Sequence, residues 1–482
     1  MTAMQTLENL RPIAADLTLL GGIFLLLLVD LAMPHGDKKR VMSWLALLAL
    51  AGSAAVTFFV DLSGPSFGGA YHGDELALFF KRVFLVGGAL AVLGSQALVA
   101  SRFSRRQAEY YLLLLVSVFG MTLLGGTRDI ILLLVCFELM SIPLYVLAAY
   151  QRQDALATEG ALKLFLTGAV SSATMVFGFS LLFGVAGTTD LYMIASHVAA
   201  NPSPAAALGI TIALAGMGFK IGVFPFHMWV PDTYEGSTTP FVAFLASVPK
   251  AAGLVAIIQV LFAGDRSLLV GVTTLLIALA ATTLVAGNLL ALNQSNVKRL
   301  LGYSGVAHMG FLLMAIATGV AEGLATLMFY VVAYLFTTVG AFLVVHTVAA
   351  CGGDDSLASF DGLGRRSGWL GMAMLVFLLS LAGIPFAVGF WAKLYVFVVA
   401  WAAGMEWLVV VAAVLSVLAL FYYLRVARAM FMNEPPADAP AVKADFATNL
   451  GILLCLAAVV GAGLYPAPLV EAAQAAATAF FG

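Results

Sequence analysis

The chain has 482 residues, of which 62% are hydrophobic and 10% are charged, and its net charge is -2. Soluble domains carry about 25% charged residues, so this composition excludes a soluble globular protein and indicates an integral membrane protein. The near-neutral charge provides no basic stripe that would follow phosphates, which argues against a nucleic-acid partner.

The hydrophobic runs have the length of helices, and they exceed the alternating strands of about ten residues that build outer-membrane barrels. A window of about 20 residues, enough for a helix to cross roughly 30 Å of hydrocarbon, finds fourteen candidate spans. The sequence therefore predicts an all-α polytopic membrane protein. In chain order the spans are centred near Phe24, Leu48, Gly88, Val116, Glu138, Val170, Leu214, Pro249, Leu279, Gly310, Ala333, Pro385, Leu418 and Leu456.

The loop cations are distributed unevenly between the two sides. The odd-numbered loops hold Lys38, Lys39, Arg40, Arg102, Arg105, Arg106, Arg152, Lys298, Arg299, Arg365, Arg366, Arg425, Arg428 and Lys443. The even-numbered loops and the termini hold Arg11, Arg128 and Arg266. Because cytoplasmic loops are rich in Lys and Arg, we expect a bacterial inner-membrane protein with both termini on the periplasmic side. Two cations in the third span fit neither side: Lys81 and Arg82.

Motifs for cofactors are missing from the sequence. Its three cysteines have no paired spacing, so neither a disulfide framework nor a metal or iron–sulfur site is predicted. No nucleotide-binding or H-E-x-x-H motif occurs either. We therefore expect no cofactor and no metal in this chain.

Charged residues remain inside the predicted spans. Each costs about 2.5–3.5 kcal/mol at a helix centre, so such a group persists only if it is paired, hydrated or functional. Four of them lie within eight residues of a proline: Glu138 before Pro143, Lys220 before Pro225, Lys250 after Pro249, and Lys393 after Pro385. A proline break leaves room for water. Burial favours a neutral lysine and a nearby carboxylate favours a charged one, so these groups suit proton transfer.

For three further candidates two interpretations stay open. Lys163 lies four residues after Glu159, and the pair is either a snorkelling ion pair or part of a transport path. His227 is either a proton-transfer group or an interfacial residue beside Trp229. His308 is either a proton relay or a neutral hydrogen-bonding residue of the bundle. Two acidic residues of “VPDTYEG” are expected to cap a loop: Asp232 and Glu235.

The seventh span, “GMGFKIGVFPFHMWVPD”, has a counterpart five spans later in “SLAGIPFAVGFWAKLYVF”. Each is a proline-broken span with one lysine. A repeat of five helices is odd in number, so the two copies are inverted, as in secondary transporters with sites at mid-membrane. The expected units are residues 1–107 (three helices), 108–262 (first repeat, helices 4–8), 263–433 (second repeat, helices 9–13) and 434–482 (helix 14).

Three segments resemble a known family: “FPFHMWVPDTYEGSTTPFVAFLASVPKAAG”, “NQSNVKRLLGYSGVAHMG” and “LAGIPFAVGFWAK”. They are similar to the antiporter-like membrane subunits of proton-translocating NADH-quinone oxidoreductase, respiratory complex I, from about the third span onward. Cation/proton antiporters and membrane-bound hydrogenases share these motifs. The chain is similar to the branch that lacks a long lateral helix and has a lysine, Lys393, where another branch has a glutamate.

The resemblance implies a role for six residues: Glu138 as the fifth-span carboxylate, Lys220 as its partner, Lys250 as the connecting lysine, Lys393 as the exit-side lysine, Lys163 as a sixth-span lysine and His308 as a member of the polar axis. One residue departs from the family pattern. After “GIP” many relatives have small or polar residues, whereas this chain has the bulky Phe386, which bears on the width of the second break.

Pushing one charge against about 150 mV takes roughly 3.5 kcal/mol, and no motif in this chain supplies that work. The resemblance implies that electron transfer from NADH to quinone supplies it. NADH, FMN, iron–sulfur clusters and quinone are then expected in partner subunits, with other complex I membrane subunits and the lipid bilayer around this chain and protons moving through it. Two alternatives stay open: a subunit of a cation/proton antiporter or hydrogenase, and a purely structural membrane subunit.

Overall fold

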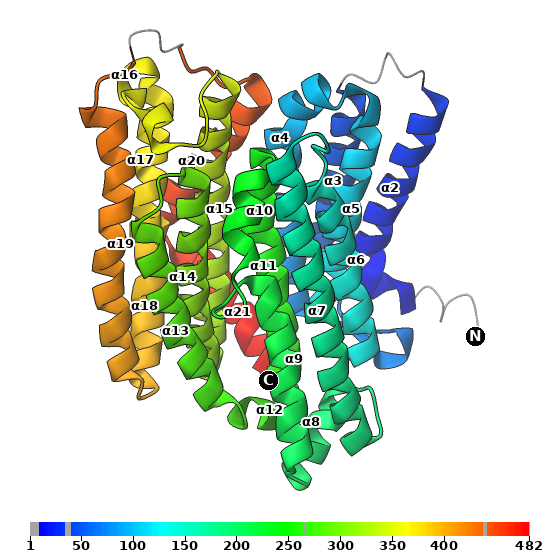
Figure 1. Ribbon diagram of the computed structural model, residues 1–482. Helices are drawn as coiled ribbons and strands as arrows, with labels where there is room; N and C mark the ends of the chain where they lie inside the picture. The colour runs from blue at the N-terminus through cyan, green and yellow to red at the C-terminus, as the bar shows by residue number, and fades with distance from the viewer. Residues whose placement is uncertain (1–8, 34–39, 265, 437–440, 482) are drawn as a thin grey trace.

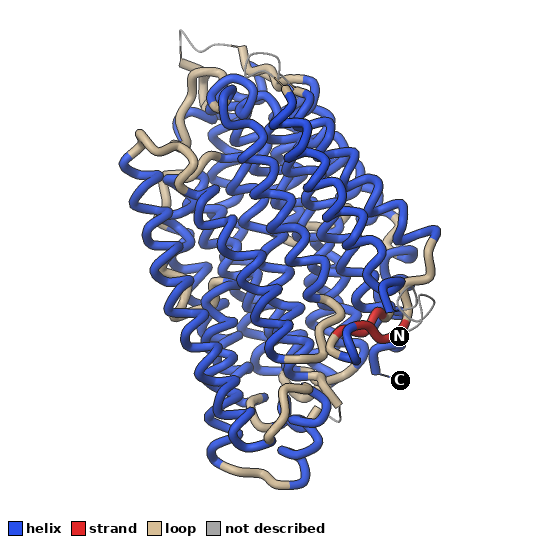
Figure 2. Tube along the Cα trace, turned by 90° about the vertical axis from the view of Figure 1, so that its right-hand side faces the viewer, coloured by secondary structure: helices blue, strands red, loops and turns tan. Residues whose placement is uncertain are grey.

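The computed structural model describes residues 9–33, 40–264, 266–436 and 441–481, and Lys38 and Lys39 of the first loop lie outside them. Long helices run side by side along one axis, and loops join them at both ends (Figure 1, Figure 2). Within the described residues the only strands are β1 (Gly64–Ser66) and β2 (Tyr71–Gly73), which pair antiparallel.

Thirteen described helices are long and apolar enough to cross a membrane. They are α2 (Ala14–Ala32), α3 (Val41–Phe59), α4 (Glu75–Arg102), α5 (Gln107–Leu124), α6 (Ile130–Ala148), α7 (Ala155–Ala186), α9 (Pro204–Ile221), α11 (Thr239–Leu261), α13 (Thr273–Leu292), α14 (Val297–Ala317), α15 (Ala321–Ala350), α19 (Glu406–Met432) and α20 (Phe446–Leu464). The remaining predicted span, the twelfth in chain order, corresponds to two shorter apolar helices, α17 (Gly368–Ala382) and α18 (Val388–Ala402). Every predicted centre falls in these elements or, for Pro385, between the last two, so the predicted fold class is confirmed.

Shorter elements connect or extend the spans: η1 (Arg11–Ile13), η2 (Phe67–Gly69), η3 (Ser104–Arg106), α8 (Leu191–Ala200), α10 (Trp229–Gly236), α12 (Ser267–Val270), η4 (Leu357–Phe360), α16 (Leu363–Arg366) and α21 (Ala467–Phe481). Polar side chains fix several helix starts by accepting hydrogen bonds from first-turn N–H groups. These caps are Asp74, Asp129, Asp154, Asp190, Ser203, Asn296 and Asp445.

Both predicted helix breaks are present. Helix α9 ends at Gly222, whose φ is 73°, and α17 ends at Gly383, whose φ is 87°; each glycine takes the left-handed conformation that closes a helix. The chain resumes as α10 after the first break and as α18 after the second. Phe386 is 78% exposed, so its bulk points away from the second break and does not narrow it.

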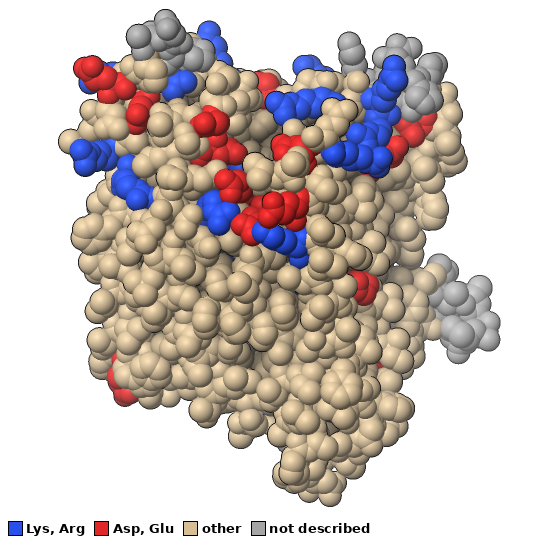
Figure 3. Space-filling view, viewed as in Figure 1, with Lys and Arg blue, Asp and Glu red and all other residues tan. Residues whose placement is uncertain are grey.

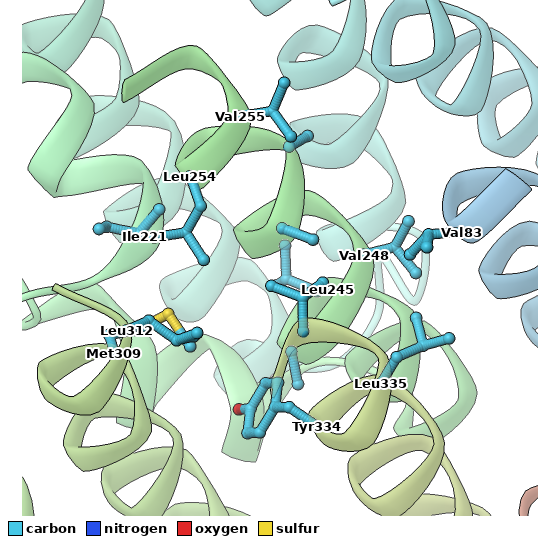
Figure 4. Close-up of a cluster of buried hydrophobic side chains, with 14 of the residues drawn as sticks. Val83, Ile221, Leu245, Val248, Leu254, Val255, Met309, Leu312, Tyr334 and Leu335 are labelled. Carbon is cyan, nitrogen blue, oxygen red and sulfur yellow. The ribbon is translucent and has the colours of Figure 1, made fainter. Parts of the chain in front are cut away.

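Helix α11 is buried along its whole length, and α14 and α15 are nearly so. Figure 4 shows Leu245 and Val248 of α11 beside Val83 of α4 and Leu335 of α15. This apolar packing keeps the centre of α11 away from lipid.

Charged residues gather at one end and on the adjoining part of the front face, whereas the lower half of that face is almost free of them (Figure 3). Several cations assigned to loops lie in helices instead. They are Arg102 in α4, Lys298 and Arg299 in α14, Arg365 and Arg366 in α16, and Arg425 and Arg428 in α19. These residues lie in the first or last turns of helices or in the short helix α16, except Arg425 and Arg428, which lie one to two turns before the end of α19.

The sequence analysis did not anticipate the final helix, α21, which packs against α4 and α15. Pro466 separates it from α20. Its many alanines make it less hydrophobic than the membrane spans, so the hydrophobicity window does not detect it. The guanidinium of Arg128 lies 5.4 Å from the ring centre of Phe480, and that of Arg266 lies 5.0 Å from the ring centre of Phe481. These contacts hold the end of α21 on the bundle.

Candidate functional site: a buried polar axis

Glu138 lies on α6, and Lys220 of α9 bonds to Ser141, one turn further along the same helix. Ser172 of α7 donates a hydrogen bond to Oε1 of Glu138. Lys220, in the last turn of α9, donates to Oγ of Ser141 at 2.6 Å, and Ser141 in turn donates to the carbonyl of its own helix. The ion pairs among the described residues do not include one between Glu138 and Lys220. The two groups are therefore connected through α6 rather than by direct contact.

Aromatic rings surround the Lys220 ammonium, which lies 5.7 Å from the ring centre of Phe137 and 5.2 Å from that of Tyr145. A cavity of about 10 Å³ reaches Lys220, and its polar lining includes Thr167 and Ser171. That volume is close to the smallest that holds one water. The ring faces and one adjacent polar space thus offset only part of the cost of burying the Lys220 charge.

Lys250 lies near the middle of α11 with 1% of its surface exposed. Among the described residues its Nζ has no hydrogen-bond partner. The ring centre of Tyr234 is 5.6 Å away. A Cβ added to Gly305 of α14 would lie 3.1 Å from Nζ and 2.6 Å from the hydroxyl of Tyr334, so this glycine makes room for both groups. A buried ammonium without a partner is costly, which suits a group that gives up its proton.

His308 of α14 lies in a cluster of tyrosines. Its Nδ1 is 2.8 Å from the hydroxyl of Tyr330, and its Nε2 is 3.4 Å from the hydroxyl of Tyr423. Its ring centre is 5.1 Å from that of Tyr334, the tyrosine next to the Lys250 site. Ser304 also bonds to Tyr423. Both nitrogens of the imidazole therefore have polar neighbours, an arrangement in which it accepts a proton on one side and donates on the other.

Lys393 of α18 lies on the far side of this cluster. Its Nζ donates to the carbonyl of Ala382 at 2.9 Å, in the last turn of α17 beside the break. The ring centre of Phe311 is 5.2 Å from Nζ and 6.2 Å from the ring centre of His308. The structure thus brings Lys250, His308 and Lys393 together through aromatic residues of α14 and α15.

His227 lies apart from these groups, in the unwound stretch between α9 and α10. Its ring centre is 5.5 Å from that of Phe224 and 6.2 Å from that of Tyr303. Its Nδ1 is buried and has no partner among the described residues. The indole of Trp229, two residues further on, donates to the carbonyl of Phe219.

Lys163 belongs to an ionic cluster near the charged end. Its Nζ lies 2.6 Å from a carboxylate oxygen of Glu159, which confirms the i,i+4 ion pair, and 2.6 Å from one of Asp232. Arg299 of α14 lies 2.7 Å from Asp232 and 2.7 Å from Glu235. The expectation that Asp232 and Glu235 cap a loop was wrong, because both lie in α10 and tie it to α7 and α14.

A polar cavity of about 610 Å³ opens at the charged end, where α4, α11, α14 and α15 meet. Its lining includes His346 of α15 and the ion pair between Lys298 and Asp355, whose nearest atoms are 2.9 Å apart. Lys298 also donates to the carbonyl of Ser237 just before α11 begins. In the described parts of the chain, no three His, Cys, Asp or Glu side chains gather as metal ligands would.

Sequence reasoning missed the serines and tyrosines of the axis. Hydroxyl groups in apolar spans are a weaker signal than a buried charge because each is cheaper to bury. The signal that could have found some of them is position, since Ser141 lies three residues after Glu138 and Tyr334 faces a glycine in “GYSGVAHMG”.

Residues 127–419 match the family model described as NADH:quinone oxidoreductase/Mrp antiporter, TM. The chain belongs to this antiporter family of membrane subunits. A curated relative from Moorella thermoacetica, named NADH-quinone oxidoreductase subunit N, is 37% identical over 458 residues, which are 95% of this chain and 96% of the relative. The family expected from the three sequence motifs is confirmed.

Solved structures agree with this antiporter family. A chain of respiratory complex I from Thermus thermophilus with bound aureothin is 34% identical, with a TM-score of 0.81 over 95% of this chain and 98% of that one. A chain of the Mrp complex from Dietzia sp. is 20% identical, with a TM-score of 0.85 over 99% of this chain and 98% of that one, and shows the shared fold alone.

Proposed function

We propose that this chain is the antiporter-like, proton-translocating membrane subunit N of a bacterial NADH-quinone oxidoreductase. It lies in the inner membrane among the other membrane subunits, with both termini in the periplasm. NADH, FMN, iron–sulfur clusters and quinone belong to partner subunits. The relatives' names and the 34% identical complex I chain support this assignment. The observation that carries it is the buried series of Lys220, Lys250 and Lys393, each with at most 8% of its surface exposed.

Glu138 and Lys220 hold the first proton in this proposal. When the Glu138 charge is close, Lys220 keeps its proton, and when that charge is neutralised or moves away, burial favours the release of the proton. Lys250 receives it, and the absence of a hydrogen-bond partner for its Nζ in the described protein makes the neutral form easy to regain. His308 relays the proton to Lys393, which releases it outward.

Protons reach the axis from the cytoplasm through the 610 Å³ cavity in this proposal. The cavity is polar, and it lies at the end where the cations gather, which the positive-inside rule assigns to the cytoplasm. Lys163 acts by holding α10 through Asp232, so it positions the break instead of carrying the proton. The inverted repeats at residues 108–262 and 263–433 each contribute one broken helix.

The test is NADH-driven proton uptake by inside-out vesicles that contain the whole complex with Lys220→Ala. We expect quinone reduction and proton uptake to fall while the complex still assembles. Ser141→Ala removes the hydrogen-bond acceptor of Lys220 and gives a smaller loss. Ser416→Ala is its matched control, because Ser416 also bonds to a carbonyl four residues back, at 2.9 Å, on α19 away from the axis. Unchanged proton uptake in Lys220→Ala would overturn the proposal, and cation exchange without NADH would favour an antiporter.

A further inference from the structure

An apolar groove lies between α13 and α19, which run side by side at the left of Figure 1. Its volume is about 670 Å³. The lining residues are Leu292, Phe421, Tyr422, Leu424, Arg425, Ala427, Arg428, Phe431 and Met432. The groove opens on the outer flank near the charged end, far along α19 from its beginning at Glu406, and the polar axis does not use it.

Two arginines line the groove toward its charged end, and Phe431 and Met432 lie beyond them. The guanidinium of Arg425 donates to the carbonyl of Leu292 at 2.9 Å and to that of Gln294, so it covers the end of α13. Its Nε is buried and has no partner among the described residues. Arg428 follows less than one turn later and is exposed. The described lining contains these two cations and no carboxylate. The end of the groove is therefore suited to an anion.

The walls below the arginines are apolar and exposed. Val414, Val417, Phe421 and Leu424 form a stripe along α19, and between 45% and 68% of each is exposed. On α13, Leu292 lines the groove. Eleven residues separate Val414 from the first arginine, or about 16 Å at 1.5 Å per residue. One leaflet of hydrocarbon is about 15 Å thick. The stripe has the length of one acyl chain.

We infer that this groove binds one anionic phospholipid of the cytoplasmic leaflet. The phosphate lies against the exposed guanidinium of Arg428, in the positive field that Arg425 adds beside it, and one acyl chain follows the stripe on α19. Charge complementarity selects an anionic headgroup over a zwitterionic one, because a juxtamembrane arginine attracts the anionic leaflet. The lipid also covers the site where Arg425 joins α13 to α19. This inference does not depend on the proton pathway.

The whole complex is purified in mild detergent, incubated with nanodiscs that contain labelled phosphatidylglycerol, and repurified before its bound lipid is quantified by mass spectrometry. Arg428→Gln is expected to retain about fivefold less label, because one arginine near the membrane surface is worth about 1 kcal/mol. Ala427→Phe fills the groove and keeps both charges, so it is expected to lose label as well. Arg105→Gln removes an exposed arginine from the same end, outside the groove, and is expected to retain the label.

A photoreactive residue in place of Leu424 identifies the occupant directly. Crosslinking to the labelled phospholipid supports the inference, and crosslinking to a neighbouring protein subunit overturns it. Equal retention of label in Arg428→Gln, Ala427→Phe and the unmodified complex also overturns it. Equal loss of label in Arg105→Gln and Arg428→Gln would show a general effect of charge and would also overturn the inference. Because Ala427→Phe leaves the arginines in place, a folding defect in Arg428→Gln does not remove the test.

Discussion

Lys393 donates a hydrogen bond of 2.9 Å to the carbonyl of Ala382, an oxygen in the last turn of α17. The last carbonyls of a helix have no partner within it, and here the break before α18 leaves this one for a side chain. The break therefore supplies the lysine with its acceptor. Lys220, beside the first break, uses the side chain of Ser141 instead. The lysine beside each break thus has a different kind of hydrogen-bond acceptor, a backbone carbonyl for Lys393 and a side-chain hydroxyl for Lys220.

Substitutions of Lys393 can distinguish a structural role, in which it bonds to the carbonyl of Ala382, from a role in proton transfer. Arginine keeps the charge and the hydrogen-bond donors but does not release its proton near neutral pH. We expect Lys393→Arg to assemble and to lose NADH-driven proton uptake, and Lys393→Met to lose uptake and also to leave the carbonyl of Ala382 unpaired. Dye-quench measurements on inside-out vesicles give the answer. Normal uptake in Lys393→Arg would mean that a fixed charge is sufficient there.

Gly305→Ala tests the approach of Lys250 and Tyr334. The new Cβ would lie 2.6 Å from the tyrosine hydroxyl and 3.1 Å from Nζ, so both groups must move. Overpacking of this kind costs about 1–3 kcal/mol. We expect proton uptake to fall in a complex that still assembles. Gly461→Ala is the matched control, since a Cβ added there meets nothing within 4 Å. If both variants pump alike, the close packing of Lys250 and Tyr334 against Gly305 is unimportant for transport.

The sequence predicted the fourteen spans, the two breaks and the buried lysines, because each depends on a strong local signal. A run of apolar residues, a proline and a buried charge are all recognisable without knowing what lies opposite. The contacts of Asp232 were mispredicted for the opposite reason. Its partners Lys163 and Arg299 are 69 and 67 residues away, and nothing near “VPDTYEG” indicates that both helices approach it.

The hydrogen-bond partners of the buried groups could not be predicted from the sequence either. Lys220 was expected to pair with Glu138, but Lys220 donates to Ser141 and Glu138 accepts from Ser172. A serine three residues after a glutamate gives no signal by itself, because its role depends on the lysine that the neighbouring helix brings to it. The tyrosines around His308 come from α15 and α19, at separations of 22 and 115 residues.

Asp232→Asn tests whether the ionic cluster holds α10 in place. Its side chain is 29% exposed and those of Lys163 and Arg299 are 42% and 26% exposed, so we expect only a small loss of stability, because solvent screens such pairs. The expected main effect is faster hydrogen exchange in α10, because two of its anchors are weakened. Exchange mass spectrometry of residues 229–236 measures it. Glu406→Gln, an exposed change at the start of α19, is the control, and equal exchange in both variants would contradict the clamp.

Lys81, which fits neither side of the membrane by its place in the sequence, forms a buried ion pair. Lys81 of α4 and Asp16 of α2 are 2% and 1% exposed and form an ion pair, and Lys81 also donates to the hydroxyl of Tyr71 at 3.0 Å. Removing one partner leaves an uncompensated buried charge, so Asp16→Leu or Lys81→Met alone is expected to destabilise the chain by about 3–5 kcal/mol. The double variant Asp16→Leu/Lys81→Met is expected to recover most of that loss, since both charges are gone.

Thermal unfolding of the purified complex is measured for the two single variants and the double variant, and the fraction of subunit that remains folded is recorded. The pair between Arg11 and Asp61 provides the contrast, because its side chains are 48% and 64% exposed. Arg11→Gln is expected to change the unfolding temperature little, as exposed pairs contribute little. Additive losses in the double variant would show that Asp16 and Lys81 stabilise the bundle separately. Recovery would show that each charge matters only because it compensates the other, and that the packing of α2 on α3 and α5 tolerates the replacement of both charges.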